Sequence, residues 1–189
     1  MTDTTEAIED VAVVDAPPIP GLSFRRAHDD DWPLLTEILN LGRVADGVDE
    51  VLSAEGLSSE YRRLDTFETT RDLLIAQIDG DPIGFSLGHR NVRGSVLVLD
   101  LWGSVVPEQR RRGIGTALHR TARARLAAEA AADPHPGPRR FQSFALDIER
   151  SDIALLEAEG FVPIRSGFEM RRELAGALPH APFPEGVEL

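Results

Sequence analysis

The residues with the clearest potential for chemistry are the arginines and glycines between Val105 and Thr116. This stretch reads Val-Val-Pro-Glu-Gln-Arg-Arg-Arg-Gly-Ile-Gly-Thr, and it lies between an apolar run and an alanine-rich one. A strand, a short turn with glycines and a helix, in that order, aim successive backbone N–H groups at one point beside a helix N-terminus. The sequence therefore predicts an anion-binding loop here.

The charges around this loop favour a ligand that carries phosphate. Residues 109–125 hold six arginines and no acidic residue, whereas the whole chain has a formal net charge of −12. A Walker loop is excluded because the chain contains no lysine. A dinucleotide-binding fingerprint would need a third glycine at position 118 and an acidic residue at the end of the next strand. Position 118 is Leu118, and neither condition is met convincingly.

The residue types that are absent narrow the chemistry further. The chain has no cysteine, all 20 of its basic residues are arginine, and Tyr61 is its only tyrosine. Disulfides, thiolate nucleophiles, cysteine-ligated metal sites and Schiff bases of lysine are thereby excluded. Catalysis would have to use carboxylates, histidine, backbone groups or water.

The predicted loop needs a strand before it and a helix after it, and the hydropathy pattern supplies both. Turn residues such as Gly80-Asp81 separate the apolar runs and predict a hairpin. We predict strands at 22–25, 72–79, 82–89, 95–106, 141–148 and 161–173, and helices at 32–41, within 47–65, at 115–132 and at 151–159. This order predicts an α/β (α+β) fold with a mixed, largely antiparallel central sheet flanked by helices.

The length of 189 residues fits one folded domain, and 42% hydrophobic with 28% charged residues is globular usage. Residues 1–20, acidic and rich in proline at their end, are predicted to form a disordered tail. Residues 21–175 are the predicted domain, and 176–189 a C-terminal tail or linker. Negative net charge argues against nucleic-acid and membrane-surface partners, and the acidic N-terminus is unlike a secretory signal, so a cytoplasmic location is expected.

The pattern Arg110-x-x-Gly113-x-Gly115 resembles the pyrophosphate loop of the GCN5-related N-acetyltransferases, and the predicted strand order fits that family over about residues 22–173. The resemblance implies that fold, acetyl-CoA as co-substrate and no metal. It implies that backbone amides of the loop hold the pyrophosphate, and that the end of the preceding strand pairs with the pantetheine arm. The cofactor-binding residues that it implies are Val105, Val106, Arg110, Arg111, Arg112, Gly113, Ile114, Gly115 and Thr116.

A second motif of that family usually reads Asn-x-x-Ala-x-x-Leu-Tyr-Glu-Lys-x-Gly-Phe. Aligned on Gly160-Phe161, this chain has Leu156 in place of the tyrosine that often protonates the leaving thiolate, and Glu149 in place of the asparagine. Tyr61 lies far away in the sequence. Because leucine replaces the motif tyrosine, protonation of the leaving thiolate by a tyrosine is in doubt.

Attack of an amine on a thioester needs a proton acceptor near the amine. Asp100, within an otherwise apolar strand, and Glu149, after the next strand, are the candidate catalytic bases. Burial would raise the pKa of Asp100 toward a useful value. The alternative interpretation of Asp100 is a structural carboxylate paired with an arginine.

Two functions remain open. The first is transfer of an acetyl group from acetyl-CoA to a primary amine of a small molecule or peptide; the second is an acyl-CoA-binding module of the same fold with weak or no turnover. A homodimer is an expected partner. Some members of the family are tandem duplications, mycothiol synthase among them, and the similar proline–glycine runs at 18–24 and 182–189 predict that this chain is the N-terminal half of such a protein. An ordinary C-terminal tail is the alternative.

Overall fold

The computed structural model of the chain describes residues 11–168 and 170. Within them the elements are β1 (Leu22–Arg26), a 3-10 turn (Asp29–Asp31), α1 (Trp32–Ala45), α2 (Ala54–Arg62), α3 (Thr69–Asp72), β2 (Leu73–Ile78), β3 (Asp81–Arg93), β4 (Val96–Val105), a second 3-10 turn (Pro107–Gln109), α4 (Ile114–Ala132), β5 (Arg139–Gln142) and α5 (Arg150–Ala158).

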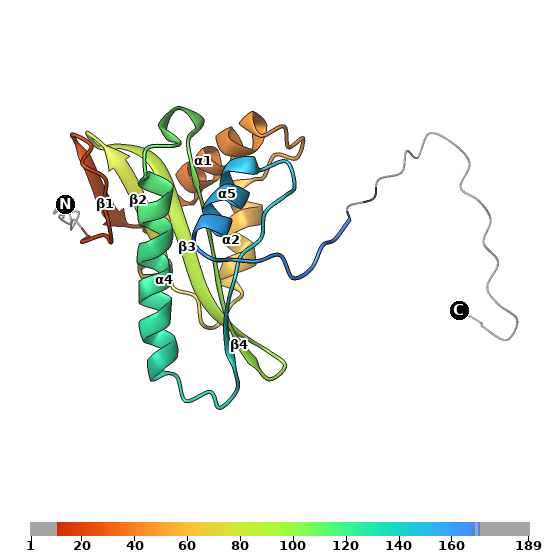
Figure 1. Ribbon diagram of the computed structural model, residues 1–189. Helices are drawn as coiled ribbons and strands as arrows, with labels where there is room; N and C mark the ends of the chain where they lie inside the picture. Colours follow the sequence, from red (N-terminus) through yellow and green to blue (C-terminus); the bar gives the residue numbers. More distant parts are fainter. Residues whose placement is uncertain (1–10, 169, 171–189) are drawn as a thin grey trace, which may run out of the picture.

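The described strands form one sheet in the order β1-β2-β3-β4-β5. Neighbours run antiparallel except β4 and β5, which are parallel because α4 crosses between them. In Figure 1, α4 covers one face of the sheet, and α1 and α2 lie over the other. The mixed, largely antiparallel sheet between helices agrees with the fold class predicted from the sequence. None of the described helices combines the length and apolar character of a membrane span.

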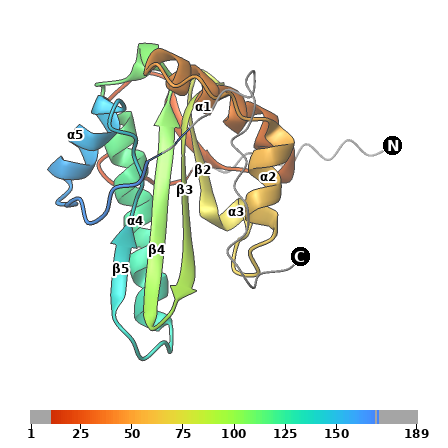
Figure 2. The same cartoon turned by 90° about the vertical axis from the view of Figure 1, so that its right-hand side faces the viewer.

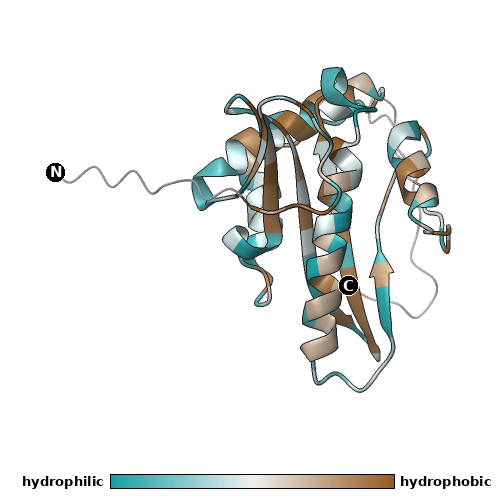
Figure 3. Cartoon of the chain, turned by 60° about the vertical axis from the view of Figure 1, so that its left-hand side comes forward, coloured by the Kyte–Doolittle hydropathy of each residue, from teal (hydrophilic) through white to brown (hydrophobic). Residues whose placement is uncertain are grey.

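The apolar residues of β2 show why the sheet is covered on both faces. Leu73 and Ile75 belong to a cluster with residues of α1 and α2, whereas Leu74 and Ala76 belong to a cluster with residues of α4. Because successive strand side chains point to opposite faces, a strand that is buried on both faces needs a continuous apolar run. Hydrophobic colour accordingly concentrates on the central strands in Figure 3.

The sheet opens between β4 and β5. Pairing between these strands starts at Leu97 and ends where Asp100 faces Gln142, so within the described residues the last part of β4 has no neighbour on that side. Figure 2 shows β5 stopping partway along β4, with α5 beyond its end. On the β3 side of the same stretch, Gly103 approaches so closely that a Cβ atom there would lie 2.2 Å from the Phe85 carbonyl oxygen. The opening is therefore bordered by a β4 segment that is packed tightly on β3.

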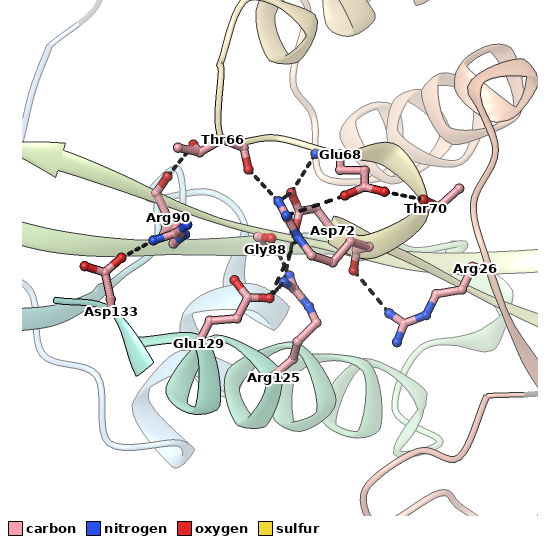
Figure 4. A network of polar contacts seen from close by, with 11 residues as sticks. Arg26, Thr66, Glu68, Thr70, Asp72, Gly88, Arg90, Arg125, Glu129 and Asp133 are labelled. Carbon is pink, nitrogen blue, oxygen red and sulfur yellow. Dashed lines mark hydrogen bonds and ion pairs between the residues drawn. The ribbon is translucent and has the colours of Figure 1, made fainter. Parts of the chain in front are cut away.

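An ion-pair network connects α4 to α3 and to the strand β3 (Figure 4). The carboxylate of Asp72, whose side chain is fully buried, accepts hydrogen bonds from Arg71 at 2.7 Å and from Arg125 at 2.9 Å. Arg125, on α4, also donates to the Gly88 carbonyl of β3 and to Glu129. The Asp72 carboxylate thus joins α3 to α4, and Arg125 joins α4 to β3.

Residues 11–20 differ from the predicted tail, because they contact the body of the protein. The Val11 N–H donates to the Phe24 carbonyl at 2.8 Å, beside β1. Val11, Val13 and Ile19 pack on the apolar cluster beneath α4, and the Asp15 carboxylate lies 2.7 Å from Arg120 of that helix. The alternating Val11 and Val13 are the apolar signal that the acidic composition obscured. Residues 1–10 lie outside the described residues.

Two predicted strands near the end of the chain were wrong in extent. The strand expected at 141–148 is only Arg139–Gln142, because the chain turns away from β4 at the opening in the sheet. Residues 161–168, expected to begin a last strand, form neither helix nor strand, and Val162 and Phe168 are exposed. Residues 169 and 171–189, which include the predicted restart at 182–189, lie outside the described part. The region 47–65 contains one helix, α2, whose third residue is Gly56.

Candidate functional site

A cavity of about 770 Å³ occupies the opening between β4 and β5. Its walls come from α1 and α2 on one side of the sheet, α4 on the other, the ends of β3 and β4, the loop before α4, the segment after β5, and α5. Segments far apart in the sequence therefore meet around one space. A cavity of this size could hold a drug-sized ligand.

The loop predicted to bind an anion lies at one end of this cavity. Arg111 and Gly113 have φ angles of 62° and 85°, and these left-handed conformations turn the chain sharply into α4. In the described structure, the backbone N–H groups of residues 111–116 donate to no protein acceptor, while the next one, that of Ala117, begins the helix by donating to Gly113. The N-terminus of the 19-residue α4 adds its dipole. The predicted geometry for an anion is therefore present.

The side chains of the predicted cofactor-binding residues fall into different environments. Arg111, Gly113, Gly115, Thr116 and Val105 line the cavity. Ile114 is instead fully buried in the core beneath α4.

Two further residues of that set, Arg112 and Val106, are engaged elsewhere. The Arg112 side chain is exposed and contacts Gln109. The Val106 N–H donates to the Ile83 carbonyl at 2.9 Å, so it continues the pairing with β3. Arg111 is thus the arginine of the loop that remains at the cavity without an ion-pair partner in the described chain.

Arg110 has a bracing contact that the sequence did not predict. Its guanidinium forms a two-pronged pair with Asp46, at 2.7 and 2.9 Å, and its Nε donates to the Val105 carbonyl at 3.1 Å. The Asp46 partner raises the pKa of Arg110 further above its ordinary value, so this cation stays charged. Because Asp46 follows α1, the pair connects α1 to the end of β4 and holds the loop in place.

The two candidate bases are not brought together. Glu149 lines the cavity, and its carboxylate accepts a hydrogen bond from the Leu146 N–H at 2.7 Å. Asp100 is not among the lining residues. It lies on the α2 side of β4, where its carboxylate is 3.0 Å from Arg93 and 3.8 Å from His89. Burial raises the pKa of Asp100, as expected, but in a structural pairing with an arginine.

Asp152 is a cavity residue that the sequence analysis did not select. It lies on α5 one turn after Glu149, at the position where the family motif has alanine. Burial raises the pKa of the Asp152 carboxyl to about 6, and the neighbouring Glu149 charge adds to this, while Arg110 opposes it. The signal in the sequence was an acidic residue on the inner face of a helix where a small apolar one was expected.

The raised pKa of Asp152 predicts a pH-dependent stability. A carboxyl group that binds its proton more tightly in the folded chain stabilises the fold below about pH 4, and this contribution is lost as the pH rises through about 6. We expect Asp152→Asn to be more stable than wild type at pH 7.5 by about 1–2 kcal/mol, since solvent reduces the effect of a half-buried charge. At pH 4 the two proteins should unfold at similar urea concentrations. Equal stabilities at pH 7.5 would contradict the burial of this charge.

Tyr61 reaches the cavity although it is distant in sequence from the family's tyrosine position. It lies on α2 within an aromatic group that includes Trp102 and Trp32, and the Trp102 Nε1–H donates to its hydroxyl oxygen at 2.7 Å. Burial raises the pKa of the Tyr61 hydroxyl well above its ordinary value. The hydroxyl is therefore neutral at physiological pH. Where the described residues are concerned, no group of three or more His, Asp or Glu side chains could hold a metal ion.

Comparison with known proteins identifies the fold by structure rather than by sequence. No protein-family model matches the chain, and no curated protein matches its sequence. Among solved structures, a GCN5-related N-acetyltransferase from Sphaerobacter thermophilus superimposes with a TM-score of 0.64 at 22% identity, over 76% of this chain and 44% of that one. The chain therefore spans less than half the length of the Sphaerobacter protein.

Two further solved structures are matched over most of their own length by this chain. A predicted acetyltransferase from Clostridium acetobutylicum, solved with acetyl-CoA, has a TM-score of 0.58 at 16% identity, covering 79% of this chain and 96% of that one. An acetyltransferase of the GNAT family from Streptococcus pneumoniae has a TM-score of 0.53 at 19% identity, covering 75% and 84%. At these identities the likeness concerns the fold alone. The chain has the fold of the GCN5-related N-acetyltransferases.

Proposed function

We propose that this protein transfers an acetyl group from acetyl-CoA to a primary amine of a small molecule or peptide. The observation that carries the proposal is the run of backbone N–H groups at 111–116, which have no protein acceptor in the described structure and lie at the mouth of the cavity. A pyrophosphate offers several acceptor oxygens and negative charge, which suits these donors, the α4 dipole and the nearby Arg111.

The pantetheine arm of acetyl-CoA also suits the residues present. The cavity continues from the loop along Leu101–Val105, the part of β4 that has no neighbour on the β5 side. An extended arm with amide groups could lie along such a free strand edge. When bound, acetyl-CoA supplies the activated acyl group, and the tight pairing of Gly103 with β3 keeps the adjacent strand edge rigid.

The acidic residues of the cavity favour a cationic acceptor. Two arginines of the cavity lining are neutralised by ion pairs, Arg110 with Asp46 and Arg43 with Glu50. Glu60, Glu149 and Asp152 also line it, and none of the three forms an ion pair with another described residue. An ammonium group would gain favourable electrostatic contacts there.

In the proposed reaction, the neutral amine nitrogen bonds to the acyl carbon and the carbon–sulfur bond breaks. The nitrogen loses one proton, and the thiolate that leaves gains one. We assign the proton of the amine to Glu149 or Asp152, which both line the cavity and could receive it directly or through water. Asp100 is not retained as a base, because it does not line the cavity.

A second candidate function is a binding module that holds acyl-CoA without turnover. Leu156 lines the cavity at the motif position where the family often has a tyrosine acid, so no phenol stands there. This observation favours slow or absent thioester cleavage, while the loop would still bind the cofactor.

Release of free thiol separates the two functions. Incubated with acetyl-CoA and a panel of primary amines, including diamines and a peptide N-terminus, the protein is expected to release CoA thiol in an amine-dependent manner, detected with a thiol reagent. Because the cavity is acidic, we expect diamines to react faster than amino acids, whose carboxylate is repelled. Binding of acetyl-CoA without release for any amine would favour the module, and absence of binding would overturn both.

A further inference from the structure

In the part of the chain that the structure describes, two residues that line the cavity each have a buried polar atom without a hydrogen-bond partner. Among the described residues, four buried side-chain nitrogen or oxygen atoms lack a hydrogen bond, and two of them belong to residues that line the cavity: Ser86 Oγ and His119 Nε2. Ser86 is 4% exposed and His119 is 8% exposed. A buried polar atom without a partner is costly, so native structures rarely keep one. These two atoms therefore point to a ligand that completes their hydrogen bonds.

Both residues lie on the α4 side of the sheet. Ser86 pairs across the sheet with Leu74, a member of the cluster beneath α4, and on its other side with Gly103 of β4. His119 lies on α4, little more than one turn after Gly115 of the loop. The two residues thus line the cavity from the α4 side, and only Gly103, which has no side chain, separates Ser86 from the free edge of β4.

The chemistry of His119 favours an uncharged partner. Burial lowers the pKa of the imidazole to about 4; Glu159 opposes this, while Arg120 and Arg123 reinforce it. The ring, which packs edge-on against Phe161 with a 5.4 Å centroid separation, is therefore neutral at pH 7. A neutral imidazole has one donor and one acceptor nitrogen, and a hydroxyl can donate one hydrogen bond and also accept, which matches amide and carbonyl groups.

We propose that Ser86 Oγ and His119 Nε2 hydrogen-bond the amide and carbonyl groups of the acyl-pantetheine arm and position it along β4. The proposal rests on the proposed function, because it assigns residues to the same bound acetyl-CoA. The two residues are positioning residues, distinct from the carboxylates that face the amine. They lie on the opposite side of the sheet from Tyr61 and Trp102, which is the side that α4 covers.

Binding measurements with ligands that have or lack the arm test this assignment. Isothermal titration would compare acetyl-CoA with ADP, which has a pyrophosphate but no pantetheine, on wild type and on three variants. His119→Phe keeps a ring against Phe161 and removes Nε2; His119→Gln restores a polar group near that position; Ser86→Ala removes Oγ on a separate element. Circular dichroism checks that each variant is folded.

We expect His119→Phe and Ser86→Ala each to weaken acetyl-CoA binding by about 3–10-fold, the range for one neutral hydrogen bond, and to leave ADP affinity unchanged. His119→Gln should recover part of the loss. Unchanged acetyl-CoA affinity in both folded variants, or an equal loss for ADP, would overturn the proposal while leaving the proposed function intact. If wild type binds ADP but not acetyl-CoA, the proposed function itself fails.

Discussion

Replacing Gly113 with aspartate is expected to abolish stabilisation of the protein by acetyl-CoA. Gly113 has a φ of 85° and provides one of the free N–H groups of the loop. Aspartate would strain this left-handed position and would place a negative charge where the pyrophosphate is proposed to bind. We expect the affinity to fall by roughly 100-fold or more. At a concentration of 100 times the wild-type Kd, a stabilisation of about 2.7 kcal/mol should nearly vanish.

The matched control for this variant is Gly94→Asp. Gly94 also has a positive φ, of 62°, and a Cβ atom there would meet nothing within 4 Å. It lies in the turn between β3 and β4, at the end of β4 opposite the loop. Gly94→Asp should lose stability through similar strain but keep its thermal shift with acetyl-CoA. A full shift retained by Gly113→Asp would contradict the assignment of the loop.

Asp72→Ala is expected to cause the largest loss of stability among the charged residues described here. Its carboxylate is fully buried and binds Arg71 and Arg125. Removing it would leave Arg125, a largely buried cation, with only Glu129 and the Gly88 carbonyl as partners. Breaking a buried pair by deleting one member costs about 3–5 kcal/mol. Urea unfolding followed by circular dichroism would measure this loss.

Asp81→Ala is the control for Asp72→Ala, because Asp81 is an exposed residue at the start of β3. Its effect should stay within about 0.5 kcal/mol. Since Arg125 lies about three turns along α4 from the loop, Asp72→Ala should also keep its thermal shift with acetyl-CoA at a temperature where it is folded. A cost below about 1 kcal/mol would mean that the network adds little to the fold.

The sequence predicted the central strands and the loop because their signals are local. Apolar runs separated by turn residues specify β2, β3 and β4, and a glycine such as Gly113 is a turn signal in the sequence, which its φ of 85° bears out. The helix after the loop was also predicted, within one residue of its observed start at Ile114. Local signals were therefore sufficient to predict the strand, the loop and the helix at this end of the cavity.

The rest of the candidate site depends on contacts between distant segments. Nothing near Arg110 in the sequence indicates that Asp46 neutralises it, and nothing near Asp100 or Asp152 indicates that only the second lines the cavity. The burial of His119 within an arginine-rich helix likewise follows from the packing of Phe161. These features require the positions of α1 and α5 relative to β4, which a pattern along the chain does not contain.

A crystal structure of the protein grown with acetyl-CoA tests the central claim most directly. We predict electron density for the pyrophosphate against the backbone N–H groups of 111–116. Density for the arm should follow Leu101–Val105 within hydrogen-bonding distance of Ser86 and His119. The acetyl group should lie in the part of the cavity lined by Glu149 and Asp152. Saturating acetyl-CoA with no density at the loop, or density bound elsewhere on the protein, would contradict this account.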